Sequence, residues 1–339
     1  MYGSVIMKIF ITGVAGFLGS HLAYRLNRLG YEIGGCDNLV GGDMRNVHRA
    51  VDFHQMDCCN FDGMQGIMRG YDLVIHTAAT AHEGLSVFSP SFITKNIFDA
   101  SVTTISAAIS VGVKRFIYCS SMARYGDQQT PFTEDMPTKP VDPYGIAKVG
   151  AEDVLKVLAQ THGLDWNIVV PHNIIGPRQK YDDPYRNVVS IMINRNLSNK
   201  PAIIYGDGTQ KRCFSYVDDC VNCIIKLATT PEIKSEVVNI GPDEETITIN
   251  ELAKIVAEEC NFYGQPLYLP GRPREVKEAT CSSDKARKML DYKTTVPLRT
   301  AIKSTVEWIK ILGPKEFVYG YPLEIVNANT PATWKDRLM

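Results

Sequence analysis

The stretch of sequence that decides the fold is Lys8-Ile-Phe-Ile-Thr-Gly-Val-Ala-Gly-Phe-Leu-Gly19. A β-prone segment, residues 8–12, leads directly into three glycines, and leucines at helical spacing follow at positions 18, 22, 26 and 29. The glycines allow a tight turn and a close approach of the backbone to a phosphate, and the following helix offers free N–H groups to a pyrophosphate. The order of strand, glycines and helix therefore predicts a dinucleotide-binding unit.

Strand-like and helix-like segments alternate through the first two thirds of the chain. The further strands that we expect end near Asp37, Met56, His76, Cys119, Val170 and Ile240. Most of them are short and apolar without a polar alternation, which is typical of strands buried on both faces of a parallel sheet. The pattern predicts an α/β fold, a Rossmann-type doubly wound parallel sheet with a smaller C-terminal substrate-binding domain.

The pattern changes after about residue 172, where loops rich in proline, glycine and charge become frequent. We expect a cofactor-binding domain over 1–172, to which about 213–240 returns, and a mainly substrate-binding domain over 173–339. Helices are expected at about 249–261 and 297–312, whereas 313–339 has no pattern that predicts structure.

The composition is that of an ordinary globular protein and argues against two classes of function. The 339 residues include 36 Lys+Arg and 37 Asp+Glu, a net charge of −1, which argues against a protein that binds nucleic acid or an anionic membrane. No apolar run is long enough to span a bilayer. The first residues lack the features of a signal peptide, so we expect a cytoplasmic protein.

Nine cysteines are scattered through the chain, and this odd number does not suggest a disulfide framework. Cys220-Val-Asn-Cys223 has the spacing of a zinc or redox pair, but neither a second pair nor a nearby histidine completes a metal site. The pair lies in an apolar segment that we interpret as a helix with both thiols in the core. No metal is expected.

Acidic residues follow two of the expected strands. A carboxylate at Asp37 can accept hydrogen bonds from an adenosine ribose and would repel a 2′-phosphate, so it favours NAD over NADP. Arg45, a few residues later, leaves NADP open. Asp57 follows the third strand, where it either contacts adenine or caps a loop.

The candidate catalytic residues are a tyrosine and a lysine in Tyr144-Gly-Ile-Ala-Lys148, directly after Asp142-Pro143, which is typical of a helix start. A free phenol titrates near pH 10, roughly, and a lysine cation on the same helix face lowers that pKa. The pair can then take a proton from a hydroxyl group. Ser120 and Ser121 follow the fifth strand at the end where open α/β sheets bind ligands, and a hydroxyl there can bond the reacting oxygen.

Together these pieces resemble the extended short-chain dehydrogenase/reductase family, in its branch of nucleotide-sugar epimerases and dehydratases of the UDP-glucose 4-epimerase type. The resemblance covers about Lys8 to Trp308. It is carried by motifs at Thr12–Gly19, Asp37–Leu39, His76–Ala79, Cys119–Gly126, Pro143–Lys148, Asn173–Arg178, Gly206–Arg212, Phe214–Asp219 and Arg272–Val276.

The resemblance implies a role for each matching residue. Tyr144 is the base, Lys148 its partner, which also holds the nicotinamide ribose, and Ser121 completes the triad, with Asn96 supporting the site. The implied NAD contacts are Gly13, Gly16, Phe17, Leu18, Gly19, Asp37, Asn38, Asp57, Cys58, Ala78, Tyr144 and Lys148. The implied substrate contacts are His82, Glu83, Ser121, Met122, Asn173, Arg212, Arg272 and Glu275. Two arginines suit a diphosphate because their forked donors form charge-assisted bonds with its oxygens.

The resemblance also implies the reaction, in which Tyr144 takes the proton of a sugar C4 hydroxyl while a hydride leaves C4 for NAD⁺. Family dehydratases carry an acid directly after the catalytic Ser or Thr, but Met122 and Ala123 here cannot transfer protons. We therefore expect a nucleotide-sugar 4-epimerase, with a UDP-sugar as substrate, in which the 4-keto intermediate rotates and the hydride returns. A 4,6-dehydratase or 3,5-epimerase is the alternative, and a non-catalytic dinucleotide-binding sensor is a remote one.

Near the expected sugar pocket, His82 and Arg124 each allow two interpretations. His82 is interpreted as a contact to a sugar hydroxyl, although with Glu83 it would suit a dehydratase. Arg124 is interpreted as a solvated charge, although inside the pocket it would indicate an acidic sugar.

Similar proteins are usually homodimers joined through two helices per subunit, here at about 98–112 and 144–162, so we expect a homodimer.

Overall fold

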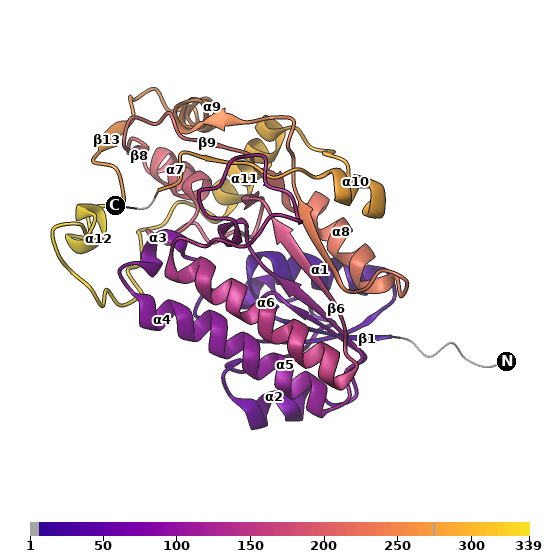
Figure 1. The fold of residues 1–339 in the computed structure, drawn as a ribbon. Helices are drawn as coiled ribbons and strands as arrows, with labels where there is room; N and C mark the ends of the chain where they lie inside the picture. Colours follow the sequence, from indigo (N-terminus) through magenta and orange to yellow (C-terminus); the bar gives the residue numbers. More distant parts are fainter. Residues whose placement is uncertain (1–6, 274) are drawn as a thin grey trace.

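The computed structural model describes residues 7–273 and 275–339, and its centre is a seven-stranded parallel sheet (Figure 1). The strand order is β11-β6-β5-β4-β1-β2-β3. The strands are β1 (Lys8–Thr12), β2 (Glu32–Asp37), β3 (Asp52–Gln55), β4 (Leu73–His76), β5 (Arg115–Cys119), β6 (Asp165–Pro171) and β11 (Glu236–Ile240). The predicted doubly wound parallel sheet is confirmed, and all seven expected strands are present in it.

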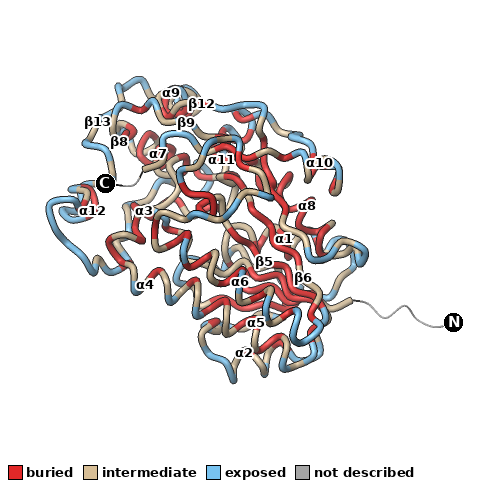
Figure 2. Tube along the Cα trace, viewed as in Figure 1, coloured by how far each residue is buried: buried red, intermediate tan, exposed pale blue. Residues whose placement is uncertain are grey.

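Helices cover both faces of this sheet. One face carries α1 (Phe17–Arg28), α8 (Val217–Thr229) and α10 (Asp284–Leu290), and the other carries α2 (Phe61–Met68), α5 (Ala100–Ser110) and α6 (Pro143–His162). Each layer has its own apolar core, so buried residues follow the strands through the middle of the molecule (Figure 2). A sheet buried on both faces explains why its strands lack polar alternation.

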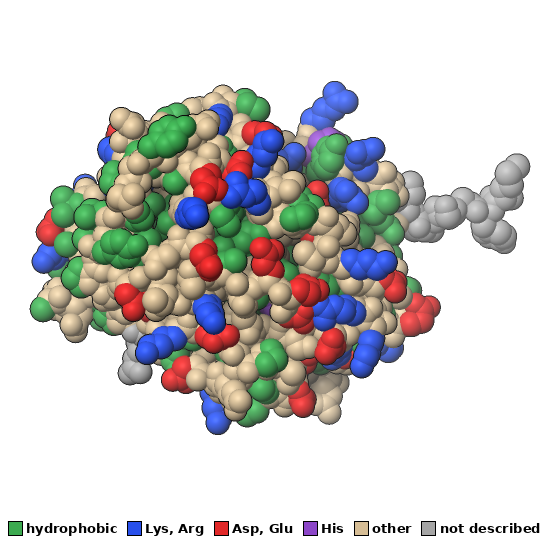
Figure 3. All heavy atoms as spheres, turned by 90° about the horizontal axis from the view of Figure 1, so that it is seen from above, with side chains coloured by type: hydrophobic (Ala, Val, Ile, Leu, Met, Phe, Trp, Pro, Cys, Tyr) green, Lys and Arg blue, Asp and Glu red, His purple; other side chains and the backbone are tan. Residues whose placement is uncertain are grey.

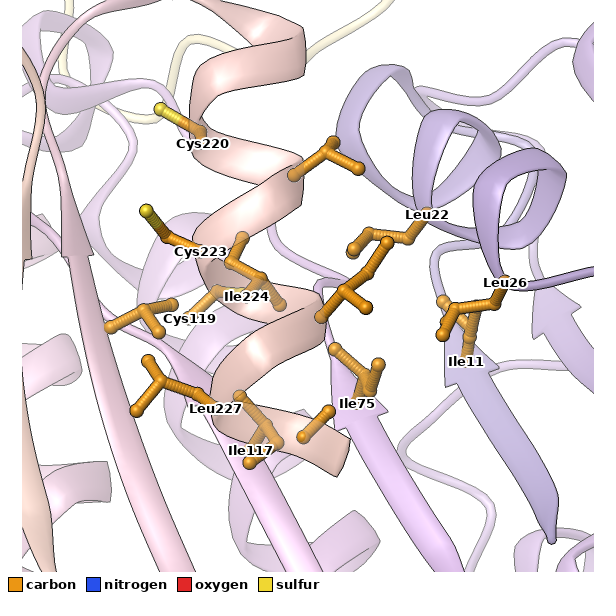
Figure 4. Packing of buried hydrophobic residues seen from close by; sticks show 14 of the residues in the cluster. Ile11, Leu22, Leu26, Ile75, Ile117, Cys119, Cys220, Cys223, Ile224 and Leu227 are labelled. Carbon is orange, nitrogen blue, oxygen red and sulfur yellow. The ribbon is translucent and has the colours of Figure 1, made fainter. Parts of the chain in front are cut away.

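The predicted return of the chain to the sheet is visible in α8 and β11. Strand β11 pairs in parallel with β6, and α8 packs on the sheet beside α1. Cys220 and Cys223 of α8 are 0% and 3% exposed and pack among apolar side chains such as Ile224 and Cys119 (Figure 4). The core interpretation of the CxxC pair is confirmed.

A second, smaller core lies beyond the carboxyl ends of the strands. It is built by α7 (Val188–Leu197), α9 (Ile249–Cys260) and α11 (Leu298–Leu312), as expected for the last two. Short strands surround it: β7 (Ile174–Ile175) with β10 (Ser215–Tyr216), β8 (Ile203–Tyr205) with β13 (Leu267–Leu269), and β9 (Lys211–Arg212) between β12 (Ile247–Thr248) and β14 (Glu278–Ala279). A capping box of Thr248 and Glu251 fixes the start of α9.

The segment 313–339, for which the sequence predicts nothing, runs beside α3 (Glu83–Ser86) and α4 (Pro90–Thr94) and ends in α12 (Ala332–Lys335) (Figure 1). Its anchor is Trp334, which is 2% exposed and donates its Nε1–H to the carbonyl of Pro184 at 3.1 Å. The segment has little regular structure because its polar backbone groups are paired with distant residues.

The surface matches the balanced composition. On the face drawn in Figure 3, acidic and basic side chains are interspersed, which suits a net charge of −1. None of the helices described has the length and hydropathy needed to cross a membrane.

Candidate functional site

A cleft of about 500 Å³ lies between the carboxyl ends of the strands and the smaller core. It is lined by residues that follow the strands, among them Gly13 after β1, Asp37 at the end of β2, Ser121 after β5 and Asn173 after β6. Ligands bind at this edge in open α/β sheets. Every NAD and substrate residue predicted from the sequence lines this cleft.

The glycine loop is packed so tightly that side chains do not fit. Gly13 has a φ of +69°, and a Cβ atom there would lie 2.9 Å from the Cα of Ala78. A Cβ at Gly19 would lie 2.2 Å from the carbonyl oxygen of Gly13. The loop thereby brings the first turn of α1, which has no side-chain cap, to the cleft beside Phe17 and Leu18. Such a cradle fits a dinucleotide pyrophosphate.

Asp37 is held in place by the backbone around it. Its carboxylate accepts N–H bonds from Ala15 at 3.1 Å and Leu39 at 2.8 Å. Burial raises the pKa of Asp37, and these backbone bonds oppose that rise. Arg45, which left NADP open, forms an exposed pair with Asp43 outside the cleft. The acid at the end of β2 is therefore not neutralised by Arg45.

Asn38 and Asp57, at the predicted adenosine end of the cleft, each stabilise a turn. Asn38 accepts the N–H of Val40 at 3.1 Å, and Asp57 accepts the N–H of Cys59 at 2.8 Å. Asp57 thus caps its loop, one of the two roles expected for it, while it and Cys58 also line the cleft.

The expected helix start at Asp142 positions the catalytic pair. The carboxylate of Asp142 accepts the N–H of Gly145 at 2.8 Å and caps α6. Tyr144 and Lys148, which are 6% and 3% exposed, therefore lie on one buried face of its first two turns. Ser121 follows β5 and lines the same cleft, and its hydroxyl lies near enough to Tyr144 to lower the pKa of the phenol. The structure thus brings the three predicted catalytic residues together.

The effect of Lys148 on Tyr144 differs from the expectation. Burial raises the pKa of Tyr144 to about 12, although the hydrogen bond from Ser121 and the charge of Arg186 lower it. Lys148 donates its Nζ–H to the carbonyl of Cys119 at 2.7 Å, and burial lowers its own pKa to about 8. The prediction that the pKa of the phenol lies below its usual value is wrong, because the effect of burial outweighs that of the nearby charges.

Arg186 is a cleft residue that the sequence did not indicate. It is half-buried, lines the cleft, and lies near enough to Tyr144 and Lys148 to affect both pKa values. Among the described residues it has neither an ion pair nor a hydrogen bond. The sequence predicts loops after about residue 172, but only the tertiary structure distinguishes this arginine from Arg178, which contacts α1 instead.

Arg124 corrects a second expectation, because it is not solvated. Its guanidinium is 3% exposed, pairs with the buried Glu152 at 3.0 Å and lies 5.0 Å from the ring of Tyr125. Ser120 bonds the same carboxylate. Glu152 is fully buried on α6 and needs these partners to offset its desolvation. Arg124 therefore does not indicate an acidic sugar.

The residues after Ser121 form a short helical turn, Met122–Arg124, capped by the Ser121 hydroxyl. Met122 lines the cleft and Ala123 is buried beside it. Asn96 also lines the cleft, from a π-helical turn before α5, and its side chain bonds the carbonyl of Phe92 at 2.8 Å. Such turns are frequent at functional sites.

His82 is held in the cleft wall by an acid that the sequence did not indicate. Its Nε2 bonds the carboxylate of Asp183 at 2.7 Å, and its Nδ1 is buried with no partner among the described residues. The ring lies 4.7 Å from that of Tyr321. Burial raises the pKa of Asp183, but the hydrogen bond and the charge of His82 outweigh this effect, so the pKa stays below its usual value. The contact between His82 and a sugar hydroxyl remains a prediction.

The opposite wall collects the remaining substrate residues. Arg212 is held by backbone carbonyls such as that of Val276 at 2.7 Å, and Arg272 pairs with Glu275 at 3.1 Å. Asn173 bonds the carbonyl of Cys213 at 2.8 Å. Glu83 lines the same cleft with an exposed side chain. Partial desolvation within the cleft and the charge of Asp142 raise its pKa to about 7, against the lowering effect of both arginines.

Comparisons with known proteins agree with this arrangement. Residues 9–241 match the model of the NAD dependent epimerase/dehydratase family. The UDP-glucose 4-epimerase of Mycolicibacterium smegmatis is 31% identical over 316 residues, which cover 90% of this chain and 99% of the relative. The UDP-glucuronate 4-epimerase of Thermodesulfobacterium geofontis is 28% identical over 313 residues, which cover 88% and 95%.

A solved structure gives the same result. The UDP-glucose 4-epimerase of Thermotoga maritima with UDP-glucose superposes with a TM-score of 0.84 at 32% identity, covering 90% of this chain and 99% of the other. The predictions of the family, of an enzyme and of NAD as its cofactor are confirmed. The chain belongs to the NAD-dependent epimerase/dehydratase family, of the extended short-chain dehydrogenase/reductase type.

Proposed function

We propose that the protein is a nucleotide-sugar 4-epimerase and that its substrate is a UDP-sugar. The observation that carries this proposal is the grouping of Tyr144, Lys148 and Ser121 beside Met122, a residue that cannot transfer a proton. The similarity to UDP-sugar 4-epimerases over almost the whole chain supports it.

The proton chemistry belongs to Tyr144. Its phenol group takes the proton of the sugar C4 hydroxyl and returns it after the ring has turned over. Ser121 holds the same oxygen, and Lys148 holds positive charge beneath the phenol on the next turn of α6. NAD⁺, held by the residues of the glycine cradle, would accept the hydride from C4 and return it.

The other end of the cleft recognises the nucleotide diphosphate. Arg212 of β9 and Arg272 of the loop after β13 both line the cleft. Their forked donors suit phosphate oxygens. Asn173 and Glu275 lie beside them, at positions that suit contacts with the diphosphate and the nucleotide ribose. Residues 173–339 thus contribute mainly substrate contacts, and 1–172 with about 213–240 mainly cofactor contacts.

Glu83 favours a second candidate function, a 4,6-dehydratase or 3,5-epimerase. Both reactions need a further group that exchanges the proton at C5, and Glu83 has a pKa of about 7 in the cleft. We keep the 4-epimerase as the first candidate because Glu83 lies near Arg212 and Arg272, which we propose bind the diphosphate and whose charges lower its pKa.

The decisive experiment is incubation of the purified protein with UDP-, GDP- and dTDP-sugars in D₂O, followed by proton NMR. We expect inversion at C4 of a UDP-sugar without deuterium at C5. Deuterium at C5, or a 4-keto-6-deoxy product, would instead support the second candidate and assign the exchange to Glu83. A Glu83→Gln variant separates the two, since it should still invert C4 if only Tyr144 moves the proton.

The homodimer expected from the resemblance is also a proposal. Helices α5 and α6 lie side by side on one face of the sheet (Figure 1), and Ile146 and Val157 of α6 are 57% and 62% exposed. A second copy of the chain that packs on this face would cover both side chains.

A further inference from the structure

One carboxylate holds both ends of the turn that carries Ser121. The turn, Met122–Arg124, follows β5 and is capped by the Ser121 hydroxyl. Before the turn, Ser120 donates its hydroxyl to Oε1 of Glu152 on α6. At the end of the turn, Arg124 donates an Nη2–H to Oε2 of the same carboxylate at 3.0 Å. The two oxygens of Glu152 thus attach both ends of the turn to the helix that carries the candidate base.

Arg124 also connects the turn to the sheet. Its Nη1–H bonds the hydroxyl of Tyr125 at 3.1 Å, and that hydroxyl donates to Oδ1 of Asn239 in β11 at 2.9 Å. The carbonyl of Arg124 accepts the N–H of Lys139, in the loop before α6, at 2.9 Å. This arginine therefore ties the turn to three other parts of the chain, which are α6, β11 and the loop before α6.

Neutralisation of charge does not by itself explain the pair of Arg124 and Glu152. The two residues are 3% and 0% exposed, and the desolvation of a buried ion pair offsets much of its attraction. A second cation, Lys156, already lies 3.8 Å from the Glu152 carboxylate, with its side chain 36% exposed. What Arg124 adds is direction, because a planar guanidinium donates to two partners at fixed angles and an ammonium group does not.

We propose that Arg124 is a positioning residue for the reaction, which acts through Glu152 to hold the Ser121 hydroxyl near Tyr144. The proposal rests on the proposed function, in which Ser121 holds the reacting oxygen. A displacement of a reacting group by about 1 Å can cost roughly a hundredfold in rate. The turn is only three residues long, so release of its end at Arg124 leaves Ser121 free to move by such a distance.

The test is a double-mutant cycle on kcat for C4 inversion, with Arg124→Met and Ser121→Ala. Ser121→Ala should lower kcat roughly a hundredfold, and Arg124→Met should lower it at least about tenfold. The double variant should match Ser121→Ala within about twofold, because Arg124 has no further effect once the hydroxyl that it positions is gone. A purely structural role would lower kcat by the same factor with or without Ser121.

Arg115→Met is the matched control, because Arg115 is a second buried arginine at the start of β5. It is 7% exposed, and its guanidinium bonds the carbonyls of Thr230 and Pro231 at 2.7 and 2.8 Å. It does not line the cleft. Loss of this arginine should lower the free energy of unfolding and leave kcat unchanged.

Hydrogen exchange with mass spectrometry tests the same contact without turnover. With NAD present, the backbone amides of residues 120–126 should exchange faster in Arg124→Met than in the unchanged protein, because one anchor of the turn is lost. In Arg115→Met the exchange of these residues should not change.

Four results would overturn the proposal. They are an unchanged kcat in Arg124→Met, a double variant slower than Ser121→Ala by the full factor of Arg124→Met, an equal loss of kcat in Arg115→Met, and unchanged exchange at 120–126. If Arg124→Met does not fold, Arg124→Lys replaces it, because one ammonium group cannot hold both Glu152 and Tyr125. That variant must show the same lack of additivity with Ser121→Ala.

Failure of the proposed function gives a different result, namely no C4 inversion by the unchanged protein in the NMR assay. If the product is instead that of the second candidate, the cycle is measured on that product, since both reactions begin with loss of the C4 hydroxyl proton. If no product forms, the exchange at 120–126 still decides whether Arg124 holds the turn.

Discussion

Burial controls the proton chemistry of Tyr144 and Lys148, the predicted base and its partner. It raises the pKa of Tyr144 to about 12 and lowers the pKa of Lys148 to about 8. In both cases the charged form loses hydration that the protein does not fully replace. The phenol of Tyr144 is therefore protonated at neutral pH, and its deprotonation depends on charges that stabilise the phenolate.

The first residue-scale prediction concerns the base. Tyr144→Phe removes the phenolic oxygen and keeps the ring in its buried position, so folding and NAD binding should be retained. Turnover should fall at least roughly a hundredfold, because the proton acceptor is lost. Steady-state rates together with NAD titration check this, and a rate close to that of the unchanged protein would contradict the assignment.

The second concerns Arg186, whose charge lowers the pKa of Tyr144. Arg186→Met removes that charge, so the pKa of Tyr144 should rise and the rise of kcat/KM with pH should move to higher pH. Arg186→Lys keeps a cation and serves as the control, with a profile close to the original. A profile that does not move in Arg186→Met would exclude the residue from the electrostatics of the base.

The third concerns Glu83 and stability. The folded pKa of about 7 lies above the ordinary value of 4.5, so the folded state holds more protons than the unfolded state between these pH values. The free energy of unfolding should therefore fall as pH rises through this range. Denaturant unfolding at several pH values should give a shallower fall for Glu83→Gln, and identical slopes would contradict the shift.

At the scale of elements, helix α6 connects folding to catalysis. Its N-terminal cap, Asp142, fixes the turn that carries Tyr144, while Glu152 two turns later binds Arg124 and Ser120 under the loop that carries Ser121. The position of the base and that of the serine are thus set from the same helix. A substitution at Asp142 or at Glu152 should therefore change both the free energy of unfolding and kcat.

Asp142→Ala tests this connection. Loss of the cap bond to Gly145 should lower the free energy of unfolding by about 1 kcal/mol and also lower kcat, because the first turn of α6 carries Tyr144. Asp142→Asn keeps an accepting oxygen and should restore most of both. Urea unfolding and steady-state kinetics are the measurements. An unchanged kcat in Asp142→Ala would contradict the prediction that the cap positions Tyr144.

At the scale of the whole molecule, the cleft is formed where two cores meet, and residues 313–339 contact both halves. The half with the sheet contributes the glycine cradle and α6, and the other half contributes Arg212 and the loop with Arg186. No single described element contains all the predicted site residues. Relative movement of the two cores would therefore separate Arg212 from Tyr144.

The quaternary prediction also belongs to this scale. If two copies pack through α5 and α6, light scattering should give a dimer mass, and Val157→Glu should produce monomers, because it buries a charge in an apolar interface. Tyr263→Glu is the control, since Tyr263 is 92% exposed on a different part of the surface. A monomer for the unchanged protein, or a dimer that Val157→Glu does not affect, would contradict this interface.

The sequence alone determined the features that depend on local patterns. Short apolar runs predicted all seven strands, the glycines after β1 predicted the cradle, and Asp142-Pro143 predicted the start of the helix that carries Tyr144 and Lys148. These features follow from backbone preferences and from spacing along one element, so neighbouring residues suffice to specify them.

Only the tertiary structure decided which side chains face the cleft and which partners they have. His82 pairs with Asp183, 101 residues away, and Arg124 turns inward to a buried Glu152. Residues 313–339, which have no sequence pattern, place Tyr321 in the same apolar cluster as Tyr144. Burial of Tyr144 also raises the pKa of its phenol, whereas the sequence predicted a lowered pKa. The physical reason is that desolvation and long-range pairing depend on what surrounds a side chain in space, which spacing along the chain does not specify.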